Sequence, residues 1–573
     1  MKQAIHITHE AAVKIGGIGA VLAGLCTADI YLKNVDRTIF YGPLFDDSPN
    51  SKDRLGKNSE ILFSTIDKIK NSIYNDSFDK ISRKYDIDIV YGTKTLFDEI
   101  HPEKVSKIEI LLLGVKNMHQ DLISIFKFQL WETYKFSCQE YETDWDFEQY
   151  LRIAIPIRMI TNYLLTNEKE TIYFSHEYMG IASCLSIDLN RLANEKIYFH
   201  AHEISTARAI TEKIPGHDVS FYHLLKDDII NNISLEHRFG SQRHNSRNEL
   251  IKLADKFDNI LAVGDWVKQE YMYLKPNTNE EKIKICYNAI PIPKYSYEQK
   301  LKSRQRLQQY CENLFNFTPD IVFSHVTRLV ISKGLWRDIS LMEELDIYFS
   351  KNNLKGFMII LSSLIGSGKP SEDIHKMEND YGWPVLHKEN YPDLIGYEND
   401  IYWSCQYFNS KSKSIKVIFI NQYGFTPAQI GNRLPENTNF ADLRLGSDAE
   451  FGMSIYEPFG IAQIETVPFG GIAVLSKVCG SAFLLEKTFE NESLKPYHII
   501  DFAQNNKDKQ NWLNLTNYER TEIEKNVLKS EAVNIFNLLP KNNKERETLF
   551  NLCQEYAHRL SWNETIKNWN LFD

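Results

Sequence analysis

The chain has 573 residues, of which 43% are hydrophobic and 25% are charged, and these values are ordinary for a globular protein with sizeable cores. Its 66 basic and 76 acidic residues give a net charge of −10, which argues against a dominant nucleic-acid-binding surface. An anionic small-molecule substrate stays open, because a cleft can be basic on an acidic protein. The length suggests about two to four domains.

Cysteine usage and hydropathy predict a cytoplasmic protein. The eight cysteines are scattered without a CxxC pair, so neither a zinc ribbon nor a disulfide framework is indicated. No stretch approaches the run of about 18 apolar residues that a membrane span needs. Residues 11–26 resemble a signal peptide, but Lys14 interrupts the apolar run, Glu10 precedes it and Leu25 is too large for a cleavage site.

Short apolar runs separated by helical stretches predict α/β structure with buried parallel strands. In the first half the predicted strands are Ala4–Thr8, Ile172–Ser175, Ile197–His200 and Asn259–Val263. In the second half they are Ile321–Val326, Phe357–Leu361, Ile415–Ile420, Phe451–Tyr456 and Ile472–Ser476. Two such halves predict two Rossmann-like, doubly wound domains that face a cleft. We expect a polar insertion or a helix-loop excursion at residues 45–85, and the long, aromatic-containing stretch 365–412 has no assigned role.

The domain plan divides the chain into three parts. Residues 1–300 form the first domain, residues 301–545 form the second domain, and residues 546–573 form a terminal helical segment. We expect the hinge in Ala289–Pro319, which begins with two prolines and continues as a polar helical pattern.

The segment Ile455–Glu465 carries the strongest chemical signal. It follows an apolar, strand-like run and opens an apolar helical pattern, and Pro458 suits a first helical turn. Gly460 lets a ligand approach the backbone closely. The N–H groups of Phe459, Gly460 and Ile461 would then face an anion, with the helix dipole behind them.

Two carboxylates flank this predicted anion site. Glu457 precedes it, and Glu465 lies about 2.2 turns further along the same face, since a helix has about 3.6 residues per turn. Such an arrangement suits a sugar nucleotide, although two glutamates at this spacing also occur on solvated helix faces. The pattern resembles the E-x7-E motif of retaining GT-B glycosyltransferases, particularly the glycogen and starch synthases.

A Gly-rich loop follows the first predicted strand and opens a helix, which is a context that can cradle phosphate. Its spacing is that of neither a P-loop nor a GxGxxG fingerprint. It resembles the Lys-x-Gly-Gly loop of glycogen synthases, with matches at Lys14, Gly16 and Gly17. In that family the lysine and the loop amides contact the diphosphate of the donor. The alternative is a tight turn with a surface lysine.

A basic element follows the predicted strand Ile321–Val326. Arg328 and Lys333 can both reach one diphosphate, where Arg offers a bidentate fork and Lys a point charge. Their charge would stabilise the departing nucleotide. The stretch is similar to the Arg-x4-Lys-Gly element of the family and matches at Arg328, Lys333 and Gly334; a solvated basic turn is the alternative.

Histidines end two predicted strands of the first half. His200 and His202 share one face of a strand and could bind a metal, but no third histidine lies at a telling spacing. The segment resembles the Thr-His-Ala segment of non-plant glycogen synthases, in which the histidine touches the transferred sugar, and His202 is the matching position. His176 and Glu177 resemble the family's His-Glu-Trp segment, with Tyr178 in place of Trp, and an acceptor contact there stays open.

The resemblance implies an α/β protein of GT-B architecture with a C-terminal helix that crosses back to the first domain. It implies the following roles. The diphosphate is held by Lys14, the Gly16 and Gly17 amides, Arg328 and Lys333; the ribose by Glu465; and the sugar by Glu457, the Phe459, Gly460 and Ile461 amides, and His202, which also shields the reaction from water. His202, Glu457, Arg328 and Lys333 are the expected catalytic group.

The implied reaction is transfer of a hexose, with glucose expected, from ADP-glucose or UDP-glucose to the non-reducing end of an α-glucan. The nucleotide sugar is a substrate, and no cofactor, metal, nucleic acid or membrane span is expected. A small sugar, sugar phosphate or lipid-linked acceptor is the alternative. A non-catalytic carbohydrate-binding protein and a metallohydrolase built on His200 and His202 are further alternatives. The donor base, the linkage and a homo-oligomeric state stay open.

Overall fold

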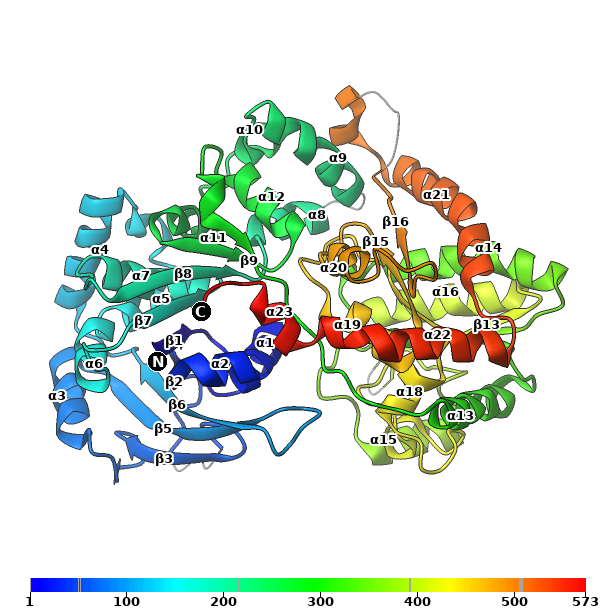
Figure 1. Ribbon diagram of the computed structural model, residues 1–573, viewed down its shortest axis with the longest axis horizontal. Helices are drawn as coiled ribbons and strands as arrows, with labels where there is room; N and C mark the ends of the chain where they lie inside the picture. Colours follow the sequence, from blue (N-terminus) through cyan, green and yellow to red (C-terminus); the bar gives the residue numbers. More distant parts are fainter. Residues whose placement is uncertain are drawn as a thin grey trace. The chain divides into compact units, whose positions relative to one another are not determined.

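The computed structural model describes residues 2–49, 51, 53–213, 217–390, 393–503 and 509–572. Its contacts divide the chain into two compact units (Figure 1). Unit 1 comprises Met1–Arg208, Leu225–Pro291 and Ser561–Asp573, and unit 2 comprises Ala209–Leu224 and Ile292–Leu560. The predicted domain boundaries and the predicted cleft stay predictions.

Among the described residues, unit 1 contains a 10-stranded sheet in the order β10-β9-β8-β7-β1-β2-β6-β5-β3-β4. The strands from β10 to β6 are parallel, whereas β5, β3 and β4 join by antiparallel pairing. In chain order the strands are β1 (Lys2–Ile7), β2 (Val35–Pro43), β3 (Ser59–Ser64), β4 (Ile69–Lys70), β5 (Asp88–Phe97), β6 (Val105–Gly114), β7 (Thr171–His176), β8 (Glu195–Ala201), β9 (Asn259–Ala262) and β10 (Ile283–Ile285).

All four predicted strands of the first half are confirmed as β1, β7, β8 and β9, with ends that differ by one or two residues. All six residues of β7 are buried, as expected for a central parallel strand. The stretch 45–85, predicted as a polar insertion or helix-loop excursion, supplies β3, β4 and the helix α3 (Asn75–Tyr85). Its polar residues fit an antiparallel edge, which can face water on one side.

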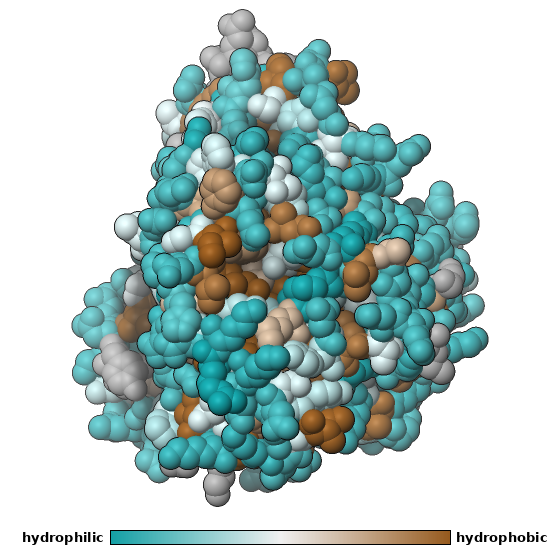
Figure 2. Space-filling model, turned by 90° about the vertical axis from the view of Figure 1, so that its left-hand side faces the viewer, coloured by the Kyte–Doolittle hydropathy of each residue, from teal (hydrophilic) through white to brown (hydrophobic). Residues whose placement is uncertain are grey.

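Helices cover the sheet of unit 1. They are α1 (Gly17–Thr27), α2 (Asp29–Asn34), α3, α4 (Gln120–Tyr134), α5 (Trp145–Ala154), α6 (Ile157–Leu164), α7 (Ile181–Asp188), α10 (Leu235–Phe239), α11 (Ser246–Lys252), α12 (Asp265–Leu274) and α23 (Trp562–Lys567), while α8 (Ser205–Lys213) and α9 (His217–Ile230) span the division between the units. The side that bears α3, α4 and α6 faces the viewer in Figure 2 and is largely hydrophilic with scattered apolar groups.

The end of the chain crosses back to the start of the chain, as predicted, and from Ser561 it packs within unit 1 against helices α1 and α2. The preceding part of the predicted terminal segment 546–573 belongs to unit 2. Trp562 of α23 lies against Gly24 of α1, where an added Cβ would overlap the indole ring. Asn563 accepts a hydrogen bond from the Asp29 N–H at 2.8 Å, and Trp569 donates from Nε1 to the Tyr287 carbonyl at 3.1 Å. These contacts tie the chain end to helices α1 and α2 (Figure 1).

Unit 2 contains a 6-stranded sheet among its described residues, in the order β13-β12-β11-β14-β15-β16, and every pairing is parallel. The strands are β11 (Ile321–Val326), β12 (Gly356–Leu361), β13 (Ile415–Ile420), β14 (Ala449–Gly452), β15 (Ile472–Ser476) and β16 (Tyr497–Ile500). The prediction is confirmed for β11, β12, β13 and β15. The strand predicted at Phe451–Tyr456 ends at Gly452, because the chain turns there toward the candidate site.

The helices of unit 2 are α13 (Tyr297–Phe315), α14 (Leu335–Lys351), α15 (Ser371–Tyr381), α16 (Tyr397–Lys411), α17 (Pro427–Ile430), α18 (Phe440–Gly446), α19 (Ile461–Ile464), α20 (Ser481–Thr488), α21 (Asn517–Leu538) and α22 (Asn543–Tyr556). Ile374, Met377 and Trp383 join the buried core with residues of β12 and β13, so the stretch 365–412 is part of the domain core. No helix of the described residues is long and apolar enough to span a bilayer.

Candidate active site

The sheet of unit 2 reverses its winding between two central strands. The chain runs outward from β11 to β12 and β13 on one side, then outward from β14 to β15 and β16 on the other. Ligands of open α/β sheets bind beyond the carboxyl ends of the strands at such a switch point. The candidate site therefore lies where the chain leaves β11 and β14.

The loop after β11 packs against the loop after β14. The Ile455 N–H donates to the Ser332 carbonyl at 2.8 Å. Gly334 has a φ of +64°, and a Cβ there would lie 2.5 Å from the Met453 carbonyl oxygen. Glycine is required at this position by both the backbone conformation and the close approach.

Lys333 and Glu457 form an ion pair between these two loops. Their side chains are 14% and 13% exposed, so the pair is largely shielded from water. The Glu457 carboxylate also accepts a hydrogen bond from Gln463 Nε2 at 2.9 Å, and its backbone carbonyl accepts one from the Gly480 N–H at 3.0 Å. The structure thus brings Lys333 and Glu457 together, although they are 124 residues apart.

The helix predicted after Glu457 is much shorter than expected. Helix α19 has only four residues and begins at Ile461, so Pro458 lies outside it and the predicted position in the first turn is wrong. Gly460 caps the helix with a φ of +86°, and a Cβ there would lie 2.8 Å from Glu457 Cγ. A helix dipole grows with length, so its expected contribution to anion binding is smaller.

Glu465 follows α19 and has a partner of its own. Its carboxylate forms an ion pair with Arg444 of α18, whose Nε also contacts Glu450 Oε2 at 3.1 Å. The prediction that Glu457 and Glu465 share one helical face is wrong, because Glu457 precedes the short helix. Lys333 and Arg444 hold the two carboxylates separately.

Arg328 lies two residues beyond β11 and is exposed. Within the described part of the chain its guanidinium has no recorded hydrogen bond or ion pair. An exposed, unpaired guanidinium at the mouth of the switch point is available to a phosphate, for which Arg has a matching bidentate geometry.

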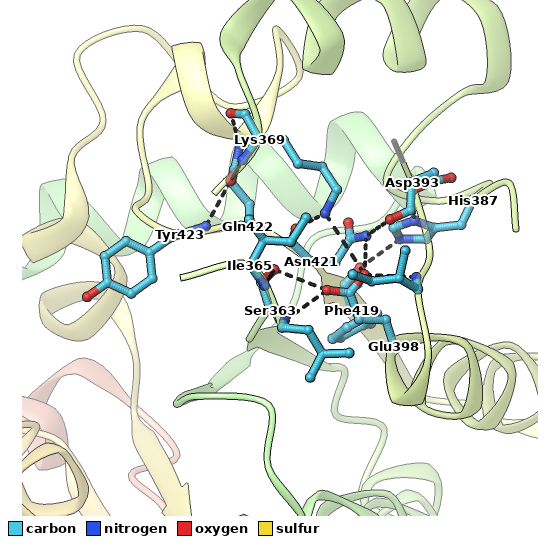
Figure 3. Close-up of polar contacts among 12 residues, drawn as sticks. Ser363, Ile365, Lys369, His387, Asp393, Glu398, Phe419, Asn421, Gln422 and Tyr423 are labelled. Atoms are coloured by element: carbon cyan, nitrogen blue, oxygen red, sulfur yellow. Dashed lines mark hydrogen bonds and ion pairs between the residues drawn. The ribbon is translucent and has the colours of Figure 1, made fainter. Parts of the chain in front are cut away.

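A buried network of polar side chains lies at the loops that follow β12 and β13 (Figure 3). One oxygen of Glu398 accepts hydrogen bonds from the Leu364 N–H at 3.0 Å and the Ser363 hydroxyl at 3.1 Å. Its other oxygen accepts from Asn421 Nδ2 at 3.0 Å and the Ile395 N–H at 3.3 Å. Four donors satisfy this fully buried carboxylate.

Lys369 completes the same network. Its Nζ donates to the Asn421 carbonyl at 2.6 Å, and its backbone exchanges hydrogen bonds with the Gln422 side chain at 2.6 and 3.0 Å. Burial lowers the pKa of Lys369. Because these groups bond one another, they shape the loops after β12 and β13, whereas the Tyr423 ring points away from the cluster and is 62% exposed (Figure 3).

The Gly-rich loop of unit 1 is held by Glu10, which the sequence did not single out for this role. The Glu10 Oε2 atom accepts hydrogen bonds from the N–H groups of Ile15 at 2.9 Å, Gly16 at 2.8 Å and Gly19 at 2.9 Å. The predicted Gly16 amide therefore already has an anionic partner. Gly17 begins helix α1, and the Lys14 ammonium lies 3.6 Å from Glu99 in an exposed ion pair.

Four histidines from β1, β7, β8 and the residue after β8 cluster in unit 1, and His9 lies near them. His176 joins His200 and His202, and His6 of β1 lies behind it, which sequence spacing did not reveal. Burial lowers the pKa of His6 and His200 to about 3, and lowers the pKa of His176 and His202 well below the ordinary value. These imidazoles are therefore neutral at physiological pH.

Glu177 lies beside the cluster in a strained conformation. Its φ of +59° falls in the left-handed region, which non-glycine residues rarely adopt. Its carboxylate accepts a hydrogen bond from the Glu203 N–H at 2.7 Å. Burial is the main cause that raises the pKa of Glu177 well above its ordinary value, and the Glu203 charge adds to it.

His176, His200 and His202 could be considered for a metal, since one ring nitrogen of each lies within 4.8 Å of the others. The ring geometry fits a metal poorly. The His200 and His202 rings stack with centroids 4.2 Å apart and planes only 28° apart, so their in-plane lone pairs run side by side. His176 Nδ1 and His202 Nε2 are also hydrogen-bonded at 2.9 Å.

Comparison with known proteins gives similarities in structure alone. No protein-family model matches the chain, and no curated protein matches it. The chain is similar to an alpha,alpha-trehalose-phosphate synthase (UDP-forming) from Burkholderia xenovorans in complex with glucose-6-phosphate, with 12% identity, a TM-score of 0.49, and coverage of 99% of this chain and 98% of that one.

The chain is likewise similar to the catalytic domain of starch synthase IV from Arabidopsis thaliana bound to ADP and acarbose. The identity is 12%, the TM-score is 0.46, and the alignment covers 96% of this chain and 99% of that one. At this identity, and with TM-scores under 0.5, the two similarities do not identify the family of the chain.

Proposed function

We propose that the chain is a retaining glycosyltransferase of GT-B architecture that transfers a hexose, with glucose expected, from a nucleotide sugar. The Lys333–Glu457 ion pair at the switch point of unit 2 is the observation that carries the proposal. A cation and a carboxylate placed side by side suit a ligand that bears both a diphosphate and sugar hydroxyls. Neither residue needs a metal for this task.

The chemistry assigned to unit 2 is charge stabilisation. Arg328 and Lys333 bind the diphosphate and offset the negative charge that develops as the nucleotide departs. When the diphosphate takes Lys333, the Glu457 carboxylate is released to accept hydrogen bonds from sugar hydroxyls. Glu465 is assigned to the ribose hydroxyls, and binding of the ribose would replace its ion pair with Arg444.

The residues of unit 1 are assigned to the same reaction by the sequence resemblance. Lys14 and the Gly17 amide would contact the diphosphate, while the Gly16 amide is bonded to Glu10 and has a supporting role. His202 would contact the transferred sugar and help to exclude water. The acceptor hydroxyl would attack on the face that the nucleotide leaves, which retains the configuration of the sugar.

For the acceptor we propose the non-reducing end of an α-glucan, with a small sugar, sugar phosphate or lipid-linked acceptor as the alternative. ADP-glucose and UDP-glucose are the proposed donors. A reducing compartment such as the cytoplasm suits the eight buried, unpaired cysteines.

The decisive experiment is a transfer assay with ADP-, UDP- and GDP-sugars as donors and with glycogen, glucose and glucose 6-phosphate as acceptors. We expect Lys333→Ala and Glu457→Gln to reduce transfer at least about 100-fold, the loss typical when one group that stabilises developing charge is removed. Lys302→Ala is the matched control, because Lys302 forms an exposed ion pair with Glu298 on the surface of α13.

Circular dichroism and thermal unfolding would establish that the variants are folded. Full activity in both site variants would overturn the assignment of the site. Failure of the wild-type protein to release a nucleotide from any donor, with or without acceptor, would overturn the proposed function and favour a carbohydrate-binding role.

A further inference from the structure

Five side chains of unit 1 form an unbroken line of hydrogen bonds that ends at His202. The Thr38 hydroxyl lies 2.9 Å from the Tyr31 hydroxyl, which lies 3.0 Å from His6 Nε2. His6 Nδ1 lies 2.9 Å from His176 Nε2, and His176 Nδ1 lies 2.9 Å from His202 Nε2. His6 lies on β1, His176 lies on the neighbouring strand β7, and His202 directly follows β8, which is the next strand of the sheet (Figure 1).

The chemistry of the groups sets the direction of this line. Every imidazole in it is neutral, so each one donates from one nitrogen and accepts at the other. A phenol is a stronger acid than a neutral imidazole N–H, and an imidazole nitrogen is a stronger base than a phenol oxygen. The Thr38 hydroxyl and the Cys26 thiol, which also contact Tyr31, are weaker acceptors than an imidazole nitrogen. Tyr31 therefore donates to His6 Nε2, and the proton of His6 resides on Nδ1.

The same alternation fixes the remaining protons. His6 donates from Nδ1 to His176 Nε2, which leaves the proton of His176 on Nδ1. His176 then donates from Nδ1 to His202 Nε2. The only place left for the proton of neutral His202 is Nδ1, the nitrogen that the line does not use.

We propose that this line of hydrogen bonds fixes His202 as the neutral Nδ1–H tautomer, so that it presents a hydrogen-bond donor to a ligand oxygen and does not act as a base. His6 and His176 are positioning residues in this arrangement, because they act through His202. That the ligand is a sugar rests on the proposed function, whereas the tautomer follows from unit 1 alone.

The surroundings of His202 suit a donor that faces outward. Its side chain is only partly exposed, and in the described ranges of the chain its Nδ1 forms no hydrogen bond. Adding a proton to His202 would turn Nε2 into a donor and would force every bond back to Tyr31 to reverse. Burial, the largest cause of the lowered pKa of His202, also disfavours the cation, as do the neighbouring residues His200 and His9.

His200 belongs to the cluster but not to the line. Both of its ring nitrogens are buried without a hydrogen-bond partner among the described residues, and its ring lies nearly perpendicular to Trp569 at a centroid distance of 5.6 Å. It packs on His202 and keeps that ring in the orientation in which Nε2 meets His176. This contact adds a steric restraint to the hydrogen bond.

The test is nuclear magnetic resonance of the full-length protein labelled with ¹⁵N only in histidine. The His202 signals are assigned by their loss in His202→Gln, and His101→Asn, which changes an exposed histidine of unit 1, serves as the control for general shifts. At neutral pH we expect His202 to show a protonated Nδ1 and an unprotonated Nε2. Free neutral histidine in water favours the opposite tautomer, so the result is diagnostic.

Two substitutions test whether the line causes this state. His6→Phe removes the bond to His176, and we expect the Nδ1–H signature of His202 to be lost. The side-chain amide of Asn can reach the position of Nδ1, so His6→Asn should restore the signature in part. Transfer by His6→Phe should fall about 10-fold in kcat with little change in donor KM, as for other outer groups that fix a histidine tautomer.

Several results would overturn the inference. They are an Nε2–H tautomer or an imidazolium at His202 in the wild-type protein, an unchanged His202 signature in folded His6→Phe, or a stoichiometric metal ion that is lost in His200→Ala. The wild-type measurement needs no variant and no activity. An absence of sugar transfer would thus contradict the proposed function while leaving the tautomer to be judged by its own spectrum.

Discussion

Glu10 shows how one carboxylate can decide what a Gly-rich loop does. A single oxygen of this residue accepts three N–H groups of the loop, and Glu10 is only 5% exposed. A carboxylate in this position orders the start of helix α1, because it satisfies amides that have no partner within the helix. The loop is therefore rigid before any phosphate arrives.

We expect Glu10→Ala to loosen the loop and to raise the donor KM about 10-fold or more, because the amides would lose about three charge-assisted hydrogen bonds. Hydrogen exchange of residues 14–20 should become faster in this variant. Glu10→Gln keeps one acceptor oxygen, so its donor KM and its hydrogen-exchange rate should lie between those of Glu10→Ala and the wild type. The assay is transfer kinetics, combined with hydrogen exchange monitored by mass spectrometry.

Glu99→Ala is the control for this prediction, since Glu99 forms an exposed ion pair with Lys14. This substitution should change neither the donor KM nor the hydrogen exchange of residues 14–20 appreciably. Protection of residues 14–20 that is equal in Glu10→Ala and in wild type would contradict the role of Glu10. An effect of Glu99→Ala as large as that of Glu10→Ala would assign the loss to charge near Lys14 instead.

At the scale of single residues, the sequence predicted which residues belong to the candidate site better than it predicted which side chains contact one another. Lys333 and Glu457 were assigned to one ligand, and the structure pairs them. The contacts of Glu10 with loop amides and of His176 with His202 were not predicted. Side-chain partners from different strands depend on sheet register, which local spacing does not encode.

Helix α19 is a short element whose start and length the apolar pattern did not predict correctly. The apolar spacing after Glu457 predicted a helix that begins near Pro458, but the chain turns at Gly460 and forms only four helical residues. Gly460 and Gly480, which follows β15, allow this path, since a Cβ at Gly460 would lie 2.8 Å from Glu457 Cγ and one at Gly480 would lie 1.9 Å from the Pro458 carbonyl oxygen. The close packing of two loops determines the helix here, and helix propensity alone does not.

The contact between helices α1 and α23 allows a test of how closely these two elements pack. Replacing a helical glycine with alanine normally stabilises a helix by about 0.5–1 kcal/mol. At Gly24 the added methyl group would overlap the Trp562 ring, so we expect a net destabilisation of about 1–3 kcal/mol, the cost of overpacking. Hydrogen exchange of residues 561–572 should become faster in Gly24→Ala.

A double-mutant cycle separates the collision from any change in helix propensity. Trp562→Leu removes the indole ring, and we expect Gly24→Ala to be tolerated or slightly stabilising in that background. If Gly24→Ala destabilises the protein equally with and without Trp562, then the contact between the two helices is not the cause.

At the scale of the whole chain, the class of fold was predictable, whereas the extent of the sheets was not. Continuous apolar runs such as Ile415–Ile420 predicted buried parallel strands, because both faces of such strands are covered. The sheet of unit 1 is larger than predicted, since β5 and β6 pair in antiparallel fashion and extend it. Residues 105–110 of β6 alternate between exposed or half-buried and buried positions, which is the period-2 pattern of a half-buried strand and differs from the continuous apolar runs on which the prediction relied.

The cysteines provide a test that involves both units and the predicted reducing environment. All eight are buried and unpaired. Burial, as the main cause, raises the pKa of Cys26, Cys138, Cys479 and Cys553 to about 12, so these thiols stay protonated at neutral pH. Because the thiolate is the reactive form, we expect the native protein to react with a thiol reagent only slowly.

Denaturation should expose all of these thiols at once. We expect eight thiols per chain to be titrated in denaturant without any added reductant, and we expect the melting temperature to be the same with and without a reducing agent. The comparison of native and denatured titrations provides the control, because both use the same protein and reagent. Fewer than eight thiols in the denatured sample would reveal a disulfide, whereas one rapidly labelled thiol in the native sample would show that a cysteine is accessible and activated.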